Sequence, residues 1–85
     1  MKVWRISDVV YEEHSGWKLY QEHTKTYGLT TGLEDGRIRA IKDSEEIIVI
    51  LDKYNKEVKN MHKLRLYIKE QIDTLEEYRA WICNG

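Results

Sequence analysis

The sequence predicts an α+β protein in which a three-stranded antiparallel β-sheet, residues 1–42, precedes one long C-terminal α-helix, residues 43–83. The 85 residues suffice for a single domain, 1–85, with a small core. Four of the five glycines fall within the first half, where β-branched and aromatic residues alternate with polar ones. The second half has no glycine before the last residue and no proline, and its apolar residues recur at helical spacing.

The first two strands are expected at 2–13, KVWRISDVVYEE, and at 17–27, WKLYQEHTKTY. Between them HSG, 14–16, is typical of a turn, because Gly16 tolerates a positive φ angle and Ser15 can hydrogen-bond its own backbone. A helix is the alternative for 17–27, but the threonine-rich end of that segment favours a strand.

The third strand is expected at 37–42, RIRAIK, where apolar residues alternate with arginines. It follows the glycine-rich segment GLTTGLEDG, 28–36, which is typical of a loop. The GLTTG part lacks the lysine and the glycine spacing of a phosphate-binding loop. A loop on a rigid frame often carries recognition, so this one is a candidate contact surface.

The helix is expected to begin at Asp43, which stands three residues before Glu46 in the spacing of a capping box. From there apolar residues alternate at spacings of four and three, a heptad seam interrupted only by Arg65 and Arg79. Other apolar residues of this half are expected to meet the sheet, namely Ile48, Ile50, Leu66, Tyr67, Tyr78 and Trp81. The seam consists of Ile47, Leu51, Tyr54, Val58, Met61, Ile68, Ile72, Leu75 and Ile82.

The stretch Asn60-Met61-His62 decides between one helix and two. Asn60 and His62 cost a helix only about 0.5 kcal/mol each, and a reversal would normally require a turn residue such as glycine. A continuous helix is therefore favoured over a helical hairpin, 44–59 and 62–82, packed on the sheet. Such a helix would be on the order of 60 Å long and would outrun the sheet. The uncovered seam then predicts a homodimer with paired helices, a coiled coil.

The formal charge of −1 argues against a general nucleic-acid binder. Positive charge is nevertheless concentrated between Asp52 and Lys69, where a helix would carry possible phosphate contacts. The longest apolar run is much shorter than a membrane-spanning helix needs, and a lone cysteine suits a reducing compartment, so a cytoplasmic location is expected. The possible phosphate contacts are Lys53, Lys56, Lys59 and Lys63.

Few residues could support catalysis or metal binding. The candidates are His14, His23, His62 and Cys83, and their spacing matches no zinc pattern. A nucleophile as close to the C-terminus as Cys83 would be poorly held in place. No catalytic residue, no metal and no cofactor is therefore predicted.

Three tryptophans and six tyrosines without a phenylalanine favour a recognition protein, because these side chains combine an apolar body with a polar tip. The predicted function is a non-enzymatic protein-binding module that dimerises and contacts a larger protein. The composition resembles that of accessory proteins of phages and other mobile elements, which inhibit or redirect a host protein by steric occlusion. The alternative is a nucleic-acid-associated regulator that uses the lysines above and an aromatic, basic sheet face. The predicted partner-binding residues are Trp17, Tyr20, Tyr27, Arg37 and Arg39.

Overall fold

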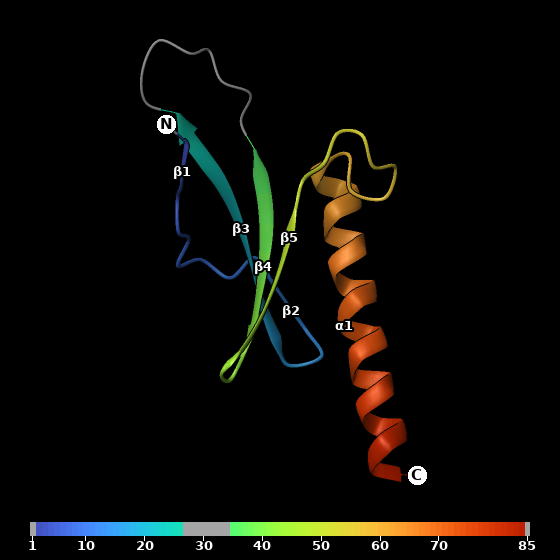
Figure 1. Cartoon of the computed structure of the whole chain (residues 1–85). Coiled ribbons are helices and arrows are strands. Elements are labelled where there is room, and N and C mark those ends of the chain that lie inside the picture. The colour runs from blue at the N-terminus through green and yellow to red at the C-terminus, as the bar shows by residue number, and fades with distance from the viewer. Residues whose placement is uncertain (1, 27–34, 85) are drawn as a thin grey trace.

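The structure, a computed structural model, describes residues 2–26 and 35–84. An antiparallel β-sheet packs against one C-terminal helix (Figure 1), which confirms the α+β class. The sheet contains more strands than the three expected. Its elements are β1 (Lys2–Trp4), β2 (Glu12–His14), β3 (Trp17–Thr26), β4 (Gly36–Lys42) and β5 (Glu45–Ile50), followed by α1 (Met61–Asn84).

The sheet has the order β1-β3-β4-β5, and β2 pairs with the other end of β3. The first predicted strand, 2–13, is therefore divided in two, with both parts on β3. Backbone hydrogen bonds from Arg5 to His23 and from Tyr11 to Leu19 mark the two points where the chain leaves and rejoins β3. Between them the chain passes over one face of the sheet, where the Ser7 amide reaches the Glu22 carboxylate.

The predicted turn at 14–16 is confirmed. Ser15 and Gly16 both have positive φ angles, 51° and 83°, and they connect the paired residues His14 and Trp17. Two consecutive positive φ angles are the signature of the tight hairpin turn that matches strand twist. Most of the predicted 28–36 loop, and Tyr27, lie outside the described residues.

The prediction of a helix from Asp43 is wrong. Asp43 has a φ of 53° and lies in the two-residue turn between the paired residues Lys42 and Glu45. The run EEIIVI forms β5 rather than a helical turn, because β-branched side chains fit the pleated surface of a sheet.

Residues 51–60 form a connecting segment of turns, and α1 begins only at Met61. Asn60 caps it, since its side-chain oxygen accepts the Lys63 amide at 2.9 Å. Neither the continuous helix 43–83 nor the helical hairpin is present, and a strand occupies the place of the first half of the helix.

The core lies between α1 and the sheet. Leu64, Ile68 and Ile72 are fully buried at successive i, i+4 positions, so one stripe of the helix faces the strands. From the sheet side the buried residues include Trp17, Leu19, Ile38 and Ala40. The hydrophobic contact between these two layers holds the helix in place.

The predicted heptad seam is not a single stripe. Ile68 and Ile72 lie in the core of their own chain, as does Val58 from the connecting segment. Ile47 belongs to β5, and Tyr54 is almost fully exposed. Leu51, Met61 and Leu75 pack on the edge of the core, whereas Ile82 is exposed.

The apolar residues expected to meet the sheet mostly do not. Tyr67 packs against the core, but the others are exposed: Ile48, Ile50, Leu66, Tyr78 and Trp81. Figure 1 shows the C-terminal turns of α1 extending past the hairpin turns of the sheet, where Tyr78 and Trp81 stack. The described part of the chain contains no helix that is both long and apolar enough to cross a membrane.

Candidate functional site

The sheet has a second face, opposite α1, which we call the outer face. Side chains alternate between the faces of a strand, so residues paired across strands share a face. Buried Leu19 pairs with buried Ala40 on the helix side, and their neighbours Tyr20 and Arg39 therefore form a pair on the outer face. The same register brings together on that face Tyr20, Glu22, Arg37, Arg39, Ile48 and Ile50.

Glu22 is the centre of the outer face and is only 1% exposed. Its two oxygens accept hydrogen bonds from the guanidinium groups of Arg37, Nε at 2.8 Å, and Arg39, Nε at 3.2 Å. The backbone amide of Ser7 donates a further bond at 2.8 Å. A buried carboxylate is tolerated only when it is paired and hydrogen-bonded in this way.

The charge state of Glu22 follows from these contacts. Burial by itself raises the pKa of the carboxyl, but the Ser7 amide and the two arginines outweigh it and hold the pKa below its ordinary value. Glu22 is therefore ionised at neutral pH. Two guanidinium groups share its one negative charge, and a second carboxylate, that of Glu46, lies 3.8 Å from Arg39, so the charges of the cluster balance.

Both arginines also stack on aromatic rings. The Arg37 Cζ lies 4.4 Å from the ring centre of Trp4, and the Arg39 Cζ lies 4.8 Å from that of Tyr20. Arg39 further donates to the Ser7 carbonyl at 3.2 Å. Each guanidinium is thus held by a carboxylate and a ring, which fixes the outer face before any partner binds.

Exposed aliphatic side chains surround this cluster. Ile48 and Ile50, opposite Arg39 and Arg37 in the register, are 41% and 52% exposed. Ile6 and Val9, on the segment that crosses the outer face, are 74% and 72% exposed. We define the outer patch as Trp4, Ile6, Val9, Tyr20, Arg37, Arg39, Ile48 and Ile50.

Three of the predicted partner-binding residues, Tyr20, Arg37 and Arg39, come together in the outer patch. Trp17 does not, because it lies on the helix side and is buried, with its indole N–H donating to Glu76 at 3.0 Å. Sequence reasoning missed Glu22 as the group that organises the arginines. The signal would have been the β3–β4 register, which the sequence alone does not specify.

The helix side of the molecule has its own carboxylate, Glu76. It accepts hydrogen bonds from Trp17 Nε1 at 3.0 Å and from Lys42 Nζ at 3.2 Å. The Trp17 bond and the Lys42 ammonium hold the pKa of Glu76 below its ordinary value. Together with the bidentate pair between Arg79 and Glu45, these contacts attach α1 to both hairpins of the sheet.

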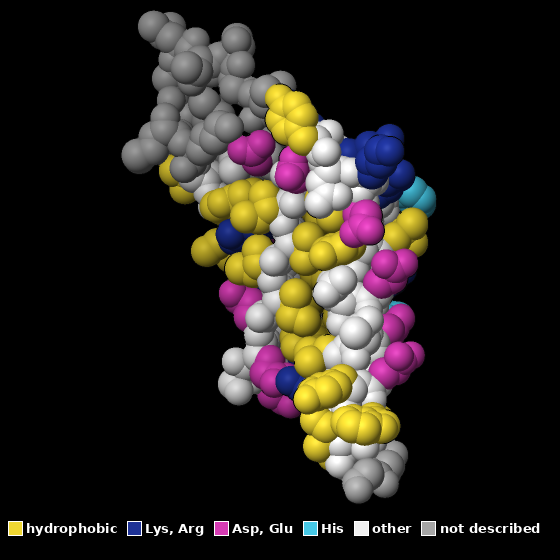
Figure 2. Space-filling view, turned by 45° about the vertical axis from the view of Figure 1, so that its right-hand side comes forward, with side chains coloured by type: hydrophobic (Ala, Val, Ile, Leu, Met, Phe, Trp, Pro, Cys, Tyr) yellow, Lys and Arg dark blue, Asp and Glu magenta, His cyan; other side chains and the backbone are white. Residues whose placement is uncertain are grey.

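The possible phosphate contacts do not form a helical stripe. Lys53, Lys56 and Lys59 lie in the connecting segment, and only Lys63 belongs to α1. Figure 2 shows basic side chains gathered at the end of the molecule where this segment lies.

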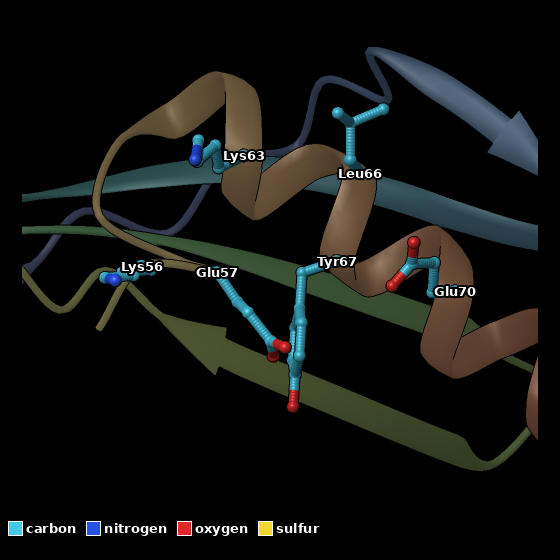
Figure 3. Close-up of a pocket in the computed structure, with 6 residues that line it drawn as sticks. All are labelled: Lys56, Glu57, Lys63, Leu66, Tyr67 and Glu70. Carbon is cyan, nitrogen blue, oxygen red and sulfur yellow. The ribbon is translucent and has the colours of Figure 1, made fainter.

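An open pocket of about 400 Å³ adjoins these lysines (Figure 3). Lys56 and Lys63 line it, but so do Glu57 and Glu70, together with Leu66 and Tyr67. In Figure 3 the Glu57 carboxylate lies beside the Tyr67 ring, on the side of the helix that faces the strands. The two acids offset the two lysines, so the lining does not select an anion.

The histidines and the cysteine lie apart. His14 Nε2 is 2.7 Å from the Asp73 carboxylate, and the His23 ring contacts Gln21 at 3.1 Å. His62 and the thiol of Cys83 are exposed near opposite ends of α1. Within residues 2–26 and 35–84, no three His, Cys, Asp or Glu side chains are grouped so that they could hold a metal ion.

No protein-family model matches the chain, and neither the curated proteins nor the solved structures include a significant match.

Proposed function

We propose that this chain is a non-enzymatic protein-binding module that docks on a larger protein through the outer patch. One observation carries the proposal: exposed isoleucine and valine side chains surround two arginines that are already fixed by Glu22, on a face that α1 leaves open. Arginine, tryptophan and tyrosine are the side chains enriched at the centre of protein interfaces.

The rigidity of the arginine pair favours binding. Ordering a flexible side chain at an interface costs about 0.5–1.5 kcal/mol, and here the carboxylate and the rings have already restricted both arginines. A partner that presents hydrogen-bond acceptors to the arginine pair and apolar side chains to its margin would be complementary.

The mode of action we propose is steric occlusion of a functional surface on the partner. The charged, tyrosine- and tryptophan-rich composition supports the analogy to accessory proteins of phages and mobile elements, which act on host proteins in this way. We propose the cytoplasm as the site of action, because a lone exposed thiol such as Cys83 stays reduced there.

Pairing through the heptad seam has no part in this proposal. Ile68 and Ile72, which would have been central to the seam, are fully buried against the sheet of their own chain. A helix–helix dimer would have to pull them out of the core.

The test is affinity capture from the native host with matched variants. The double variant Ile6→Lys/Val9→Lys introduces two positive charges into the outer patch at positions that lie outside the strands. The control, Leu66→Lys, introduces a positive charge on the exposed side of α1. The proposal expects a protein that is retained by the wild type and by Leu66→Lys but lost with the double variant. A protein retained equally by all three would show that the outer patch is not the docking face.

A second candidate function, nucleic-acid binding, is favoured by the exposed lysines of the connecting segment. Binding through Lys53, Lys56 and Lys59 would weaken steeply with salt, with a slope of about 0.9 per phosphate contact. Replacing all three lysines by alanine should then lower the slope by about 0.9 for each phosphate contact that is lost. Absent or salt-insensitive binding to DNA and RNA would exclude it.

A further inference from the structure

We infer that two copies of this chain join edge to edge along β5, so that their sheets continue into one another across a two-fold axis. The inference goes beyond the proposed function, because it rests on backbone groups of β5 rather than on docking to a foreign protein. Three features of the strand support it: its free edge, the lack of protection on that edge, and a pattern of residues that is complementary to itself.

The free edge follows from the hydrogen bonding of β5. This strand ends the order β1-β3-β4-β5 and pairs only with β4 among the described elements. The Leu51 amide donates to the Gly36 carbonyl of β4 at 2.8 Å. In an antiparallel strand the N–H and C=O groups of successive residues point alternately toward one neighbouring strand and away from it. Val49 and Ile47 therefore also face β4, whereas the N–H and C=O groups of Glu46, Ile48 and Ile50 point away from the sheet.

These outward groups have no backbone hydrogen-bond partner among the described residues. No backbone hydrogen bond among residues 2–26 and 35–84, outside the β4–β5 ladder, uses Glu46, Ile48 or Ile50. Figure 3 shows β5 as the outermost strand of the sheet in this view, and the buried stripe of α1 packs on the sheet through the core residues of one face.

Monomeric sheet proteins usually protect such an edge with proline, charged side chains (lysine above all), a bulge or a short strand. The chain has no proline, the charged residues of β5 are confined to its first two positions, Glu45 and Glu46, and its register with β4 runs without a bulge from Ile50 to Glu45. The opposite edge differs, because there β1 and β2 have three residues each and the chain between them leaves the sheet. The edge of β5 is thus the one suited to pairing.

The residues of β5 are complementary to a second copy of themselves. An antiparallel pairing centred on Ile48 places Ile48 opposite its own equivalent and Glu46 opposite Ile50 of the second copy. Every outward residue then exchanges both of its backbone hydrogen bonds, about six in all. On the side of the helix, Ile47 meets Val49 of the second copy.

Charge supports a second copy as the occupant. In this register the two Glu46 carboxylates are never directly opposite each other, which avoids the repulsion that like charges produce across a sheet. The half-exposed Ile48 gains an apolar neighbour, its own equivalent in the second copy. In Figure 2 hydrophobic side chains form a band along the side where β5 and α1 lie, so the contact would extend beyond the backbone. An isologous pair of this kind closes on itself and forms no fibre.

The first test is sedimentation over a concentration series with Ile48→Pro. The Ile48 amide does not bond to β4, so proline should leave the fold intact and remove the central edge bonds. We expect a wild-type dimer and a dissociation constant raised at least about 30-fold in Ile48→Pro, with an unchanged circular dichroism spectrum. Trp81→Lys, at the exposed end of α1, and Ile6→Lys/Val9→Lys, in the outer patch, should both remain dimeric.

The second test is independent of proline and reports the register. Hydrogen-bonded antiparallel pairs have Cα atoms about 5.5 Å apart, a separation that a disulfide spans. Ile48→Cys in a Cys83→Ser background should therefore form a disulfide-linked dimer on mild oxidation. Leu66→Cys in the same background should remain largely monomeric.

Several outcomes would overturn the inference. They are a wild type that is monomeric at every concentration, a dimer that dissociates in Trp81→Lys but not in Ile48→Pro, and an Ile48→Cys variant that does not cross-link. If the wild type is monomeric and Ile48→Pro nevertheless loses the captured protein, the edge receives a foreign strand instead. If Ile6→Lys/Val9→Lys loses the captured protein but remains a dimer, the result supports both docking through the outer patch and self-pairing along β5.

Discussion

Replacement of Ile68 by alanine tests which side of α1 holds the molecule together. Ile68 is 0% exposed and lies in the core between Leu64 and Ile72. Truncating a fully buried isoleucine costs 2–5 kcal/mol, so we expect Ile68→Ala to lower the free energy of unfolding by about 3 kcal/mol. A domain of this size has a total stability of about 4–13 kcal/mol, so the loss would be large.

Leu66→Ala is the matched control two positions away. Leu66 is 50% exposed, so the same truncation removes much less buried surface and should cost about 1 kcal/mol or less. For a domain of 60–100 residues, about 3 kcal/mol corresponds to a fall in Tm of about 12–24 °C, which separates the two variants clearly.

Urea denaturation followed by far-UV circular dichroism, at one protein concentration, measures both free energies. If both variants lose the same free energy of unfolding, or Leu66→Ala loses more, then α1 is rotated relative to this structure. An Ile68→Ala chain that keeps its stability but loses self-association would instead support the helix seam predicted from the sequence.

Two further predictions concern the buried carboxylate and the tryptophan. Glu22→Gln should destabilise the fold by about 3 kcal/mol at neutral pH, because two largely buried arginines lose the carboxylate that they share. The folded pKa of Glu22 lies below the ordinary value of 4.5, so this contribution is complete above that pH and is lost as the pH falls through the folded pKa. The urea midpoints of wild type and Glu22→Gln should therefore converge in acid, and a constant difference at all pH values would contradict the assigned ion cluster. Trp17→Phe should raise the pKa of Glu76 toward its ordinary value, since the indole hydrogen bond is the largest influence on it. An NMR titration of the Glu76 carboxyl measures this, and an unchanged pKa would exclude the bond.

The strands of the first half could be predicted from local pattern, because alternation and the Ser15-Gly16 turn are short-range signals. In the second half, local pattern gave a wrong prediction, a helix that begins at Asp43. Ile47, Leu51, Tyr54 and Val58 happen to keep heptad spacing, yet they belong to a strand and to a segment of turns. The β-branched run of β5 and the two-residue turn at Asp43 were the competing signals. Pairing with β4 made the strand the more stable choice, and that contact is not local in the sequence.

The candidate site divides in the same way. Alternation in RIRAIK was enough to place Arg37 and Arg39 on one face. It could not show that Glu22, on another strand, would lie between their guanidinium groups. That arrangement depends on register, which is set by how the whole sheet pairs. Trp17 was predicted to bind a partner but is buried under α1 for the same reason, since a strand pattern does not show which face of the sheet a helix will cover.

Amide hydrogen exchange along β5 tests most directly the claim that this strand is an edge reserved for another chain. The amides of Ile47, Val49 and Leu51 should be protected at every protein concentration, because they bond to β4. Those of Glu46, Ile48 and Ile50 should exchange rapidly in dilute solution and become protected as the concentration rises. Exchange at Ile48 that stays rapid at all concentrations would contradict the self-pairing of the β5 edge.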